Sequence, residues 1–253
     1  MQKLTDLRLA VLIDADNVPK KSIKNVMEEI AIYGTPTIKR IYGDFTRNEL
    51  AGWKSELLEN AITPVQQFGY TTGKNSTDSA MIIDAMDILY DGKVDGFCLI
   101  SSDSDFTRLA LRIRESGLTV IGFGEKKTPN PFIVACDKFL YLEILASNNE
   151  TAAETQTTGG ERKKVADKNI PKKTLKLITT SIQDLGDEDG WAFLGELGNL
   201  LIKKQPDFDP RNCGYRSLTP LVKSIDSLEI DVRETGNSNI KHIYVRNKKN
   251  GKQ

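Results

Sequence analysis

The stretch Cys98-Leu99-Ile100-Ser101-Ser102-Asp103-Ser104-Asp105-Phe106 decides the fold that this sequence predicts. Its apolar beginning is typical of a buried β-strand, and small polar residues with two carboxylates follow at once. In an open parallel sheet, ligands bind in the crevice outside the carboxyl ends of the strands. We therefore expect Asp103 and Asp105 to hold a hard cation, Mg²⁺ or Mn²⁺, because such ions prefer oxygen ligands.

A helix N-cap is the competing interpretation of these residues, because Ser and Asp side chains accept hydrogen bonds from the free N–H groups of a following helix. A second stretch of the same design favours the metal site. Residues 9–13 are again apolar throughout, as in a central parallel strand, and Asp14, Asp16 and Asn17 come directly after them. Two strands thus bring acidic residues to one edge of a sheet.

Three further acids extend this group. Residues 37–42 alternate as a strand that ends at Asp44. Asp78 falls in the first turn of a helix that Ser76 or Thr77 would cap, where the helix dipole alone also favours an acid. Asp84 lies among apolar residues of the same helix, where a carboxylate is costly to bury unless it is paired. We interpret Asp84 as a candidate metal ligand or as a support for one.

Helical and strand patterns alternate over the first 146 residues. Helices are predicted at residues 23–31, 49–60, 80–90 and 106–115, and further strands at 62–68, 118–123 and 138–142. This alternation is typical of an α/β domain with a parallel sheet, and Pro64 places the strand at 62–68 at its edge.

A second domain follows a polar segment. Residues 147–160 contain almost no large apolar side chain, so a flexible linker is predicted over residues 147–169. Helices at 172–182, 192–201 and 218–225 and strands at 228–233 and 242–246 predict a winged helix-turn-helix over residues 170–249. Such folds contact nucleic acids or proteins. Trp191 and Phe208 are expected in its core.

Composition excludes several classes of protein. The 253 residues carry 35 Lys and Arg against 35 Asp and Glu, so any polyanion must be bound by a local surface. Three scattered cysteines fit neither a disulfide framework nor a zinc site, which indicates the reducing cytoplasm. The sequence has no leader pattern and no apolar run of about 18 residues, so we expect a soluble protein without membrane contact.

The acids point to phosphodiester chemistry. The single histidine, His242, lies in the second domain, which excludes a nucleophilic triad from the first. Carboxylates packed together raise one another's pKa unless a cation neutralises them. With Mg²⁺ or Mn²⁺ they can generate hydroxide and stabilise in-line attack on a phosphodiester. Asn17 is suited to orient a water or a phosphate oxygen, and Lys74 and Arg108 to contact the phosphate.

Three motifs resemble the NYN domains of the PIN-like nuclease superfamily: Leu12–Asn17, Lys74–Asp78 with Asp84 six residues on, and Ile100–Phe106. The resemblance covers about residues 6–145. It implies a PIN-like three-layer domain with a central, mostly parallel sheet, and a metal-dependent ribonuclease. The acids that it assigns to catalysis are Asp14, Asp78, Asp103 and Asp105, with Asn17, Asp44 and Asp84 in support.

The segment Gly190–Leu221 resembles the OST-HTH (LOTUS) domain, a winged helix associated with RNA binding and, in some animal proteins, with helicase contacts. RNA is therefore the expected partner, and a protein partner is a second expectation. The candidate RNA-binding residues of this domain are Arg211, Arg216, Lys223, Arg233, Lys241 and Arg246.

Two functions of different class follow, with a third outside them. The first is a ribonuclease that its own LOTUS domain targets to RNA. The second is a non-catalytic RNA-binding or adaptor protein that keeps the acids for metal-assisted binding. A third is a sugar or nucleotide phosphatase on a doubly wound fold, with an aspartate nucleophile. The full set of carboxylates favours the nuclease.

Overall fold

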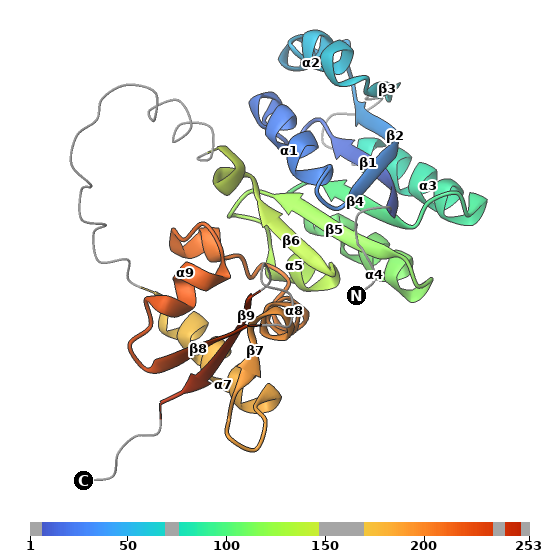
Figure 1. The fold of residues 1–253 in the computed structure, drawn as a ribbon. Coiled ribbons are helices and arrows are strands. Elements are labelled where there is room, and N and C mark those ends of the chain that lie inside the picture. The colour runs from blue at the N-terminus through green and yellow to red at the C-terminus, as the bar shows by residue number, and fades with distance from the viewer. Residues whose placement is uncertain (1–6, 69–75, 147–169, 235–240, 249–253) are drawn as a thin grey trace, which may run out of the picture. The chain divides into compact units, whose positions relative to one another are not determined.

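The computed structural model describes residues 7–68, 76–146, 170–234 and 241–248 (Figure 1). Contacts within the chain divide it into two compact units, Met1–Thr158 and Gly159–Gln253. The linker predicted at 147–169 and the candidate residue Lys74 lie outside the described residues. Within those residues, every helix is too short or too polar to cross a membrane.

A six-stranded sheet organises the first unit. Its order is β3-β2-β1-β4-β5-β6, and every neighbouring pair is parallel. The strands are β1 Leu7–Asp14, β2 Gly34–Gly43, β3 Thr63–Gln66, β4 Gly96–Ile100, β5 Thr119–Gly124 and β6 Lys138–Tyr141. β3 lies at the edge, where Pro64 removes no internal ladder bond. The prediction of an α/β fold around a parallel sheet is confirmed.

Helices cover both faces of this sheet and make three layers (Figure 1). The helices α1 Ile23–Ile30 and α2 Trp53–Asn60 pack on one face, and α3 Ser76–Asp91, α4 Thr107–Glu115 and α5 Asn130–Ala135 on the other. Successive side chains of β1 point to opposite faces, so Val11 packs toward α1 and Leu12 toward α3. β1 is apolar at residues 9–13 because both of its faces are covered.

The strand order reverses between β1 and β4. The chain runs outward from β1 to β2 and β3, then returns to the other side of β1 as β4. β1 and β4 are parallel and in register, with Ile13 beside Ile100, so Asp14 and Ser101 follow at the same edge. In doubly wound sheets this reversal is where ligands bind.

The second unit is small and has a core of its own. Its helices are α7 Lys172–Leu185, α8 Leu194–Lys204 and α9 Leu218–Lys223, and its antiparallel sheet has the order β7-β9-β8. The strands are β7 Ala192–Phe193, β8 Leu228–Glu234 and β9 Lys241–Asn247. The helix predicted at 192–201 begins instead at Leu194, because the two residues before it pair with β9.

The two aromatic residues expected in this core have different settings. Phe208 is buried among the apolar residues of the core, as predicted. Trp191 is only half-buried and lies outside that cluster, so the expectation of burial was wrong for it. It directly precedes β7 and lies under two arginine side chains of the sheet.

Candidate functional site

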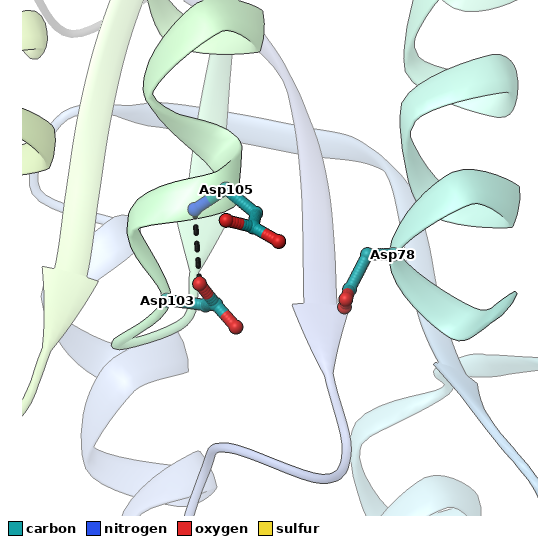
Figure 2. A group of neighbouring side chains, drawn as sticks. All are labelled: Asp78, Asp103 and Asp105. Atoms are coloured by element: carbon teal, nitrogen blue, oxygen red, sulfur yellow. Dashed lines mark hydrogen bonds between the residues drawn. The ribbon is translucent and has the colours of Figure 1, made fainter. Parts of the chain in front are cut away.

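Three carboxylates meet where the strand order of the first unit reverses (Figure 2). Asp103 and Asp105 come from the turn after β4, and Asp78 from the first turn of α3. Figure 2 shows the three side chains directed into the space between that turn and the start of α3. One oxygen from each carboxylate lies within 4.8 Å of the other two.

This donor set fits a hard divalent cation. Mg²⁺ binds oxygen ligands at about 2.1 Å, so two ligands of one ion are at most about 4.2 Å apart. Three oxygens within 4.8 Å of one another therefore need only small side-chain movements to meet one ion. A site with carboxylate oxygens and without thiol or imidazole ligands favours Mg²⁺ or Mn²⁺.

Asp103 combines the two interpretations of its motif. It caps the 3₁₀ turn Ser104–Phe106, and its Oδ1 accepts the backbone N–H of Asp105 at 2.9 Å. The cap fixes the turn that directs the two carboxylates toward α3. The capping bond and the acidic group therefore belong to one arrangement, and one does not exclude the other.

Asp14 lies beside this group and is almost fully buried, with 1% of its surface exposed. Its Oδ2 accepts hydrogen bonds from Ser101 Oγ at 2.7 Å and Asn17 Nδ2 at 2.8 Å, and its Oδ1 accepts the N–H of Asp16 at 3.1 Å. Ser101 Oγ also accepts the N–H of Asp103 at 3.0 Å. Ser101 thus connects the ends of β1 and β4, a role that sequence reasoning missed.

Two carboxylates at this edge, Asp14 and Asp78, have a raised pKa. Burial raises the pKa of Asp14 against the opposing effect of its hydrogen bonds. Partial burial, followed by the charges of Asp14, Asp103, Asp105 and Asp16, raises the pKa of Asp78 to about 6. Five carboxylates therefore share one electrostatic environment, which a bound cation would relieve.

Asp78→Asn is expected to stabilise the metal-free protein at neutral pH. The pKa of Asp78 is about 6 when folded against an ordinary 3.8, so the folded state loses stability as pH rises through this window. A shift of roughly two units corresponds to about 3 kcal/mol, which solvent screening of this partly exposed group reduces to roughly 1 kcal/mol. Urea unfolding at pH 4 and pH 7 in a chelator measures the gain.

The matched control for this prediction is Asp87→Asn, which changes an exposed acid of the same helix outside the group. We expect its effect on the free energy of unfolding to be the same at both pH values. The prediction fails if Asp78→Asn gives no larger gain at pH 7 than at pH 4.

Asp84 is not part of the acidic group. Its two carboxylate oxygens accept hydrogen bonds from the guanidinium of Arg40 and the hydroxyl of Tyr42, which link α3 to β2. Burial, and then the bond to Asp84, raises the pKa of Tyr42, so its hydroxyl stays a donor. The pairing satisfies the half-buried carboxylate without a cation. We therefore remove Asp84 from the candidate metal ligands.

Asp44 also has protein partners. It follows β2 at the carboxyl edge of the sheet, and its Oδ1 accepts hydrogen bonds from the N–H of Thr46 at 3.2 Å and from Gln66 Nε2 at 2.8 Å. These bonds close the turn after β2 and attach it to β3. The structure does not bring Asp44 into the group formed by Asp78, Asp103 and Asp105.

The predicted RNA-binding residues have different environments. Arg108 is exposed in the first turn of α4, three residues after Asp105. Arg211 is half-buried, and its guanidinium pairs with Asp209 at 2.8 Å, which gives it a structural role. Arg216 and Lys223 are exposed on the second unit. The other three, Arg233, Lys241 and Arg246, belong to the antiparallel sheet and pair with carboxylates of that sheet.

The cysteines do not provide a nucleophile at the acidic edge. Cys98 and Cys136 are buried free thiols, and burial raises the pKa of both. Cys98 lies inside β4 among apolar side chains. A thiol with a raised pKa is a poor nucleophile at neutral pH.

The strand order 3-2-1-4-5-6 is also that of dinucleotide-binding folds, in which a glycine-rich first turn receives the pyrophosphate at a helix N-terminus. The corresponding turn here reads Asp14-Ala15-Asp16-Asn17, and its carboxylates would repel a pyrophosphate. The fold and site therefore define an α/β protein with an acidic site where the strand order reverses.

Comparison with protein families agrees with this class. The NYN domain matches residues 8–143, and the OST-HTH/LOTUS domain matches residues 168–240. Because the first match spans more than half of the sequence, the chain belongs to the NYN domain family. NYN domains form part of a nuclease superfamily, and LOTUS domains bind RNA.

Solved structures of uncharacterised proteins are similar to parts of the chain. A protein of unknown function from Vibrio parahaemolyticus is 21% identical, with a TM-score of 0.45, over 55% of this chain and 94% of its own. A protein from Nitrosomonas europaea is 32% identical, with a TM-score of 0.28, over 39% of this chain and 88% of its own. No curated protein matches the chain significantly.

Proposed function

We propose that this chain is a divalent-metal-dependent ribonuclease that hydrolyses RNA phosphodiesters with Mg²⁺ or Mn²⁺. The observation that carries the proposal is the meeting of the Asp78, Asp103 and Asp105 carboxylates within 4.8 Å at the edge of a NYN-family sheet. In this proposal residues 1–146 cleave RNA, residues 170–249 bind it, and residues 147–169 link the two.

Each acidic-site residue has a distinct task in this proposal. Asp78, Asp103 and Asp105 would hold the cation, whose chemistry there would be to make a water more acidic and to neutralise negative charge on the phosphate. Asp14 fixes the amide of Asn17 and the hydroxyl of Ser101 through its hydrogen bonds. The amide oxygen of Asn17 is then an acceptor suited to orient the attacking water.

A positively charged side chain that contacts the substrate completes the site. Arg108 is exposed one helical turn beyond Asp105, so its guanidinium is suited to bind a phosphate oxygen of the RNA. Lys74, which lies outside the described residues, is a second candidate for this contact. Substrate binding beside so many carboxylates also requires the bound cation, because the phosphate would otherwise meet uncompensated negative charge.

A cleavage assay with end-labelled single-stranded RNA tests this function. We expect cleavage with Mg²⁺ or Mn²⁺ and none in excess chelator. Cleavage that continues in chelator would contradict the metal-dependent mechanism. RNA that is bound but stays intact with both cations would favour the alternative, a non-catalytic RNA-binding or adaptor protein.

A further inference from the structure

Aromatic rings gather on the outer face of the antiparallel sheet in the second unit. Phe193 of β7 lies opposite Tyr244 of β9, with ring centroids 5.7 Å apart, and its centroid is 5.1 Å from that of His242. The alternation along β9 explains this face. Val245 and Ile243 point into the core, and so His242 and Tyr244 point away from it.

Two guanidinium groups lie over rings of the same face. The guanidinium carbon of Arg246 is 4.4 Å from the ring centroid of Trp191. That of Arg233 is 4.1 Å from the centroid of Tyr244 and 5.6 Å from that of Trp191. We call this set the stacking face; its members are Trp191, Phe193, Arg233, His242, Tyr244 and Arg246.

The guanidinium groups of the stacking face are held in place by carboxylates. Arg233 Nε pairs with Asp231 at 2.8 Å, and Arg246 Nε pairs with Glu229 at 2.8 Å. These pairs orient the planar groups before any ligand binds, which lowers the entropy cost of binding. They also neutralise much of the charge, so these arginines are better suited to stacking than to long-range attraction of phosphate.

Trp191 is held by its own turn. The backbone N–H of Trp191 donates to Asp187 Oδ1 at 2.8 Å, and the backbone carbonyl of Trp191 accepts the backbone N–H of Asp187 at 3.0 Å. Gly190 has a φ of 80°, a conformation that glycine adopts without strain, so the turn brings Trp191 to the start of β7. The indole is therefore positioned without being buried in the core.

We propose that the stacking face binds the unpaired bases of single-stranded RNA. The inference rests on the proposed function and names the surface by which the second unit would hold its RNA. Aromatic rings and guanidinium planes stack on bases with little sequence preference. A duplex offers no free base faces along its length, so the stacking face should select single strands.

Tryptophan fluorescence tests this site directly. The chain has two tryptophans, and Trp53 is 2% exposed in the core of the first unit. We expect a single-stranded oligoribonucleotide to quench the fluorescence of the full-length protein in chelator, which prevents cleavage. Trp191→Phe should remove most of the quenching while RNA binding persists, because phenylalanine still offers a ring.

A charge-conserving pair of substitutions separates stacking from electrostatic attraction. Arg233→Lys with Arg246→Lys keeps both charges and the ability to pair with Asp231 and Glu229, but it removes both planes. We expect RNA affinity to fall roughly tenfold, with the slope of log affinity against log salt unchanged. The matched control is Arg8→Lys, at an exposed arginine of the first unit that also pairs with a carboxylate, Asp95; it should bind RNA as wild type.

Three outcomes would overturn the inference. The first is RNA binding by the lysine double variant as tight as that of wild type. The second is RNA binding by wild type without any change in Trp191 fluorescence. The third is equal competition by a duplex of the same sequence.

If the wild-type chain binds no RNA, the RNA-binding part of the proposed function fails together with this inference. Loss of cleavage alone contradicts the nuclease and leaves the stacking face unaffected. A thermal melt of each variant checks that the fold is retained.

Discussion

Asp103→Asn is expected to lower metal-dependent RNA cleavage by at least roughly a hundredfold, since even the supporting partners of metal ligands usually contribute 10- to 100-fold. The change removes a charged oxygen from the group of three carboxylates. The asparagine oxygen can still accept the N–H of Asp105, so the cap of the following turn should survive. Single-turnover cleavage of labelled RNA under excess protein measures the effect.

RNA affinity, measured in chelator so that neither protein holds the cation, should be unchanged or improved in the same variant, because the site loses one negative charge near the phosphate. Asp87→Asn serves as the matched control, since it removes an exposed carboxylate of α3 outside the group. It should cleave at the wild-type rate. Wild-type cleavage by Asp103→Asn would exclude Asp103 as a catalytic metal ligand.

Removal of residues 170–253 is expected to weaken RNA binding, in contrast to Asp103→Asn, which should lose cleavage and keep RNA binding. The first unit should remain folded, because its two core clusters contain no residue of the second unit. RNA affinity should fall and its salt dependence should flatten, by about 0.7 in slope for each phosphate of a single strand that the truncated protein no longer binds. Exposed cations outside the stacking face, such as Arg216 and Lys223, would account for the salt-dependent part.

Filter binding of a single-stranded RNA over a range of salt concentrations measures both quantities. The full-length protein in chelator is the reference, and the truncated protein is compared under the same conditions. Unchanged affinity with an unchanged slope would assign the second unit to protein contacts, as the helicase association of LOTUS domains suggests.

The strands that build the candidate site could be predicted because burial on both faces leaves a clear pattern. β1 and β4 are apolar runs that end in acids, and both lie at the centre of the sheet. Asp78 follows from a different pattern, its place in the first turn of a helix that begins at the same edge. These residues meet because parallel strands end at one edge, which is a rule of topology and needs no knowledge of side-chain contacts.

The hydrogen-bond partners could not be predicted in the same way. The sequence predicts Asp84 as a metal ligand or a support for one because it lies among apolar residues, but its partners Arg40 and Tyr42 come from a strand more than 40 positions earlier. Ser101 has the same parity as Leu99, which lies in the core cluster on the side of α3, α4 and α5, so strand alternation was a signal for its direction. Only the folded structure connects its hydroxyl to Asp14.

The aromatic residues on the outer sheet face of the second unit could not be predicted from the sequence for a related reason. A strand of two residues is too short to show alternation, so β7 was absorbed into the predicted helix. Trp191 was assigned to the core because aromatic residues are usually buried. Its actual place depends on the pairing of β7 with β9, which lies about 50 positions further along the chain.

The central claim is that Asp78, Asp103 and Asp105 hold one divalent cation. Crystals grown with Mn²⁺ test it most directly, because manganese gives an anomalous X-ray signal that identifies its position. We predict an anomalous peak with carboxylate oxygens of all three residues at about 2.1 Å, near the distance typical of such small divalent ions, and its loss in Asp103→Asn. A well-ordered site without a peak at saturating Mn²⁺, or a peak that persists in Asp103→Asn, would contradict the claim.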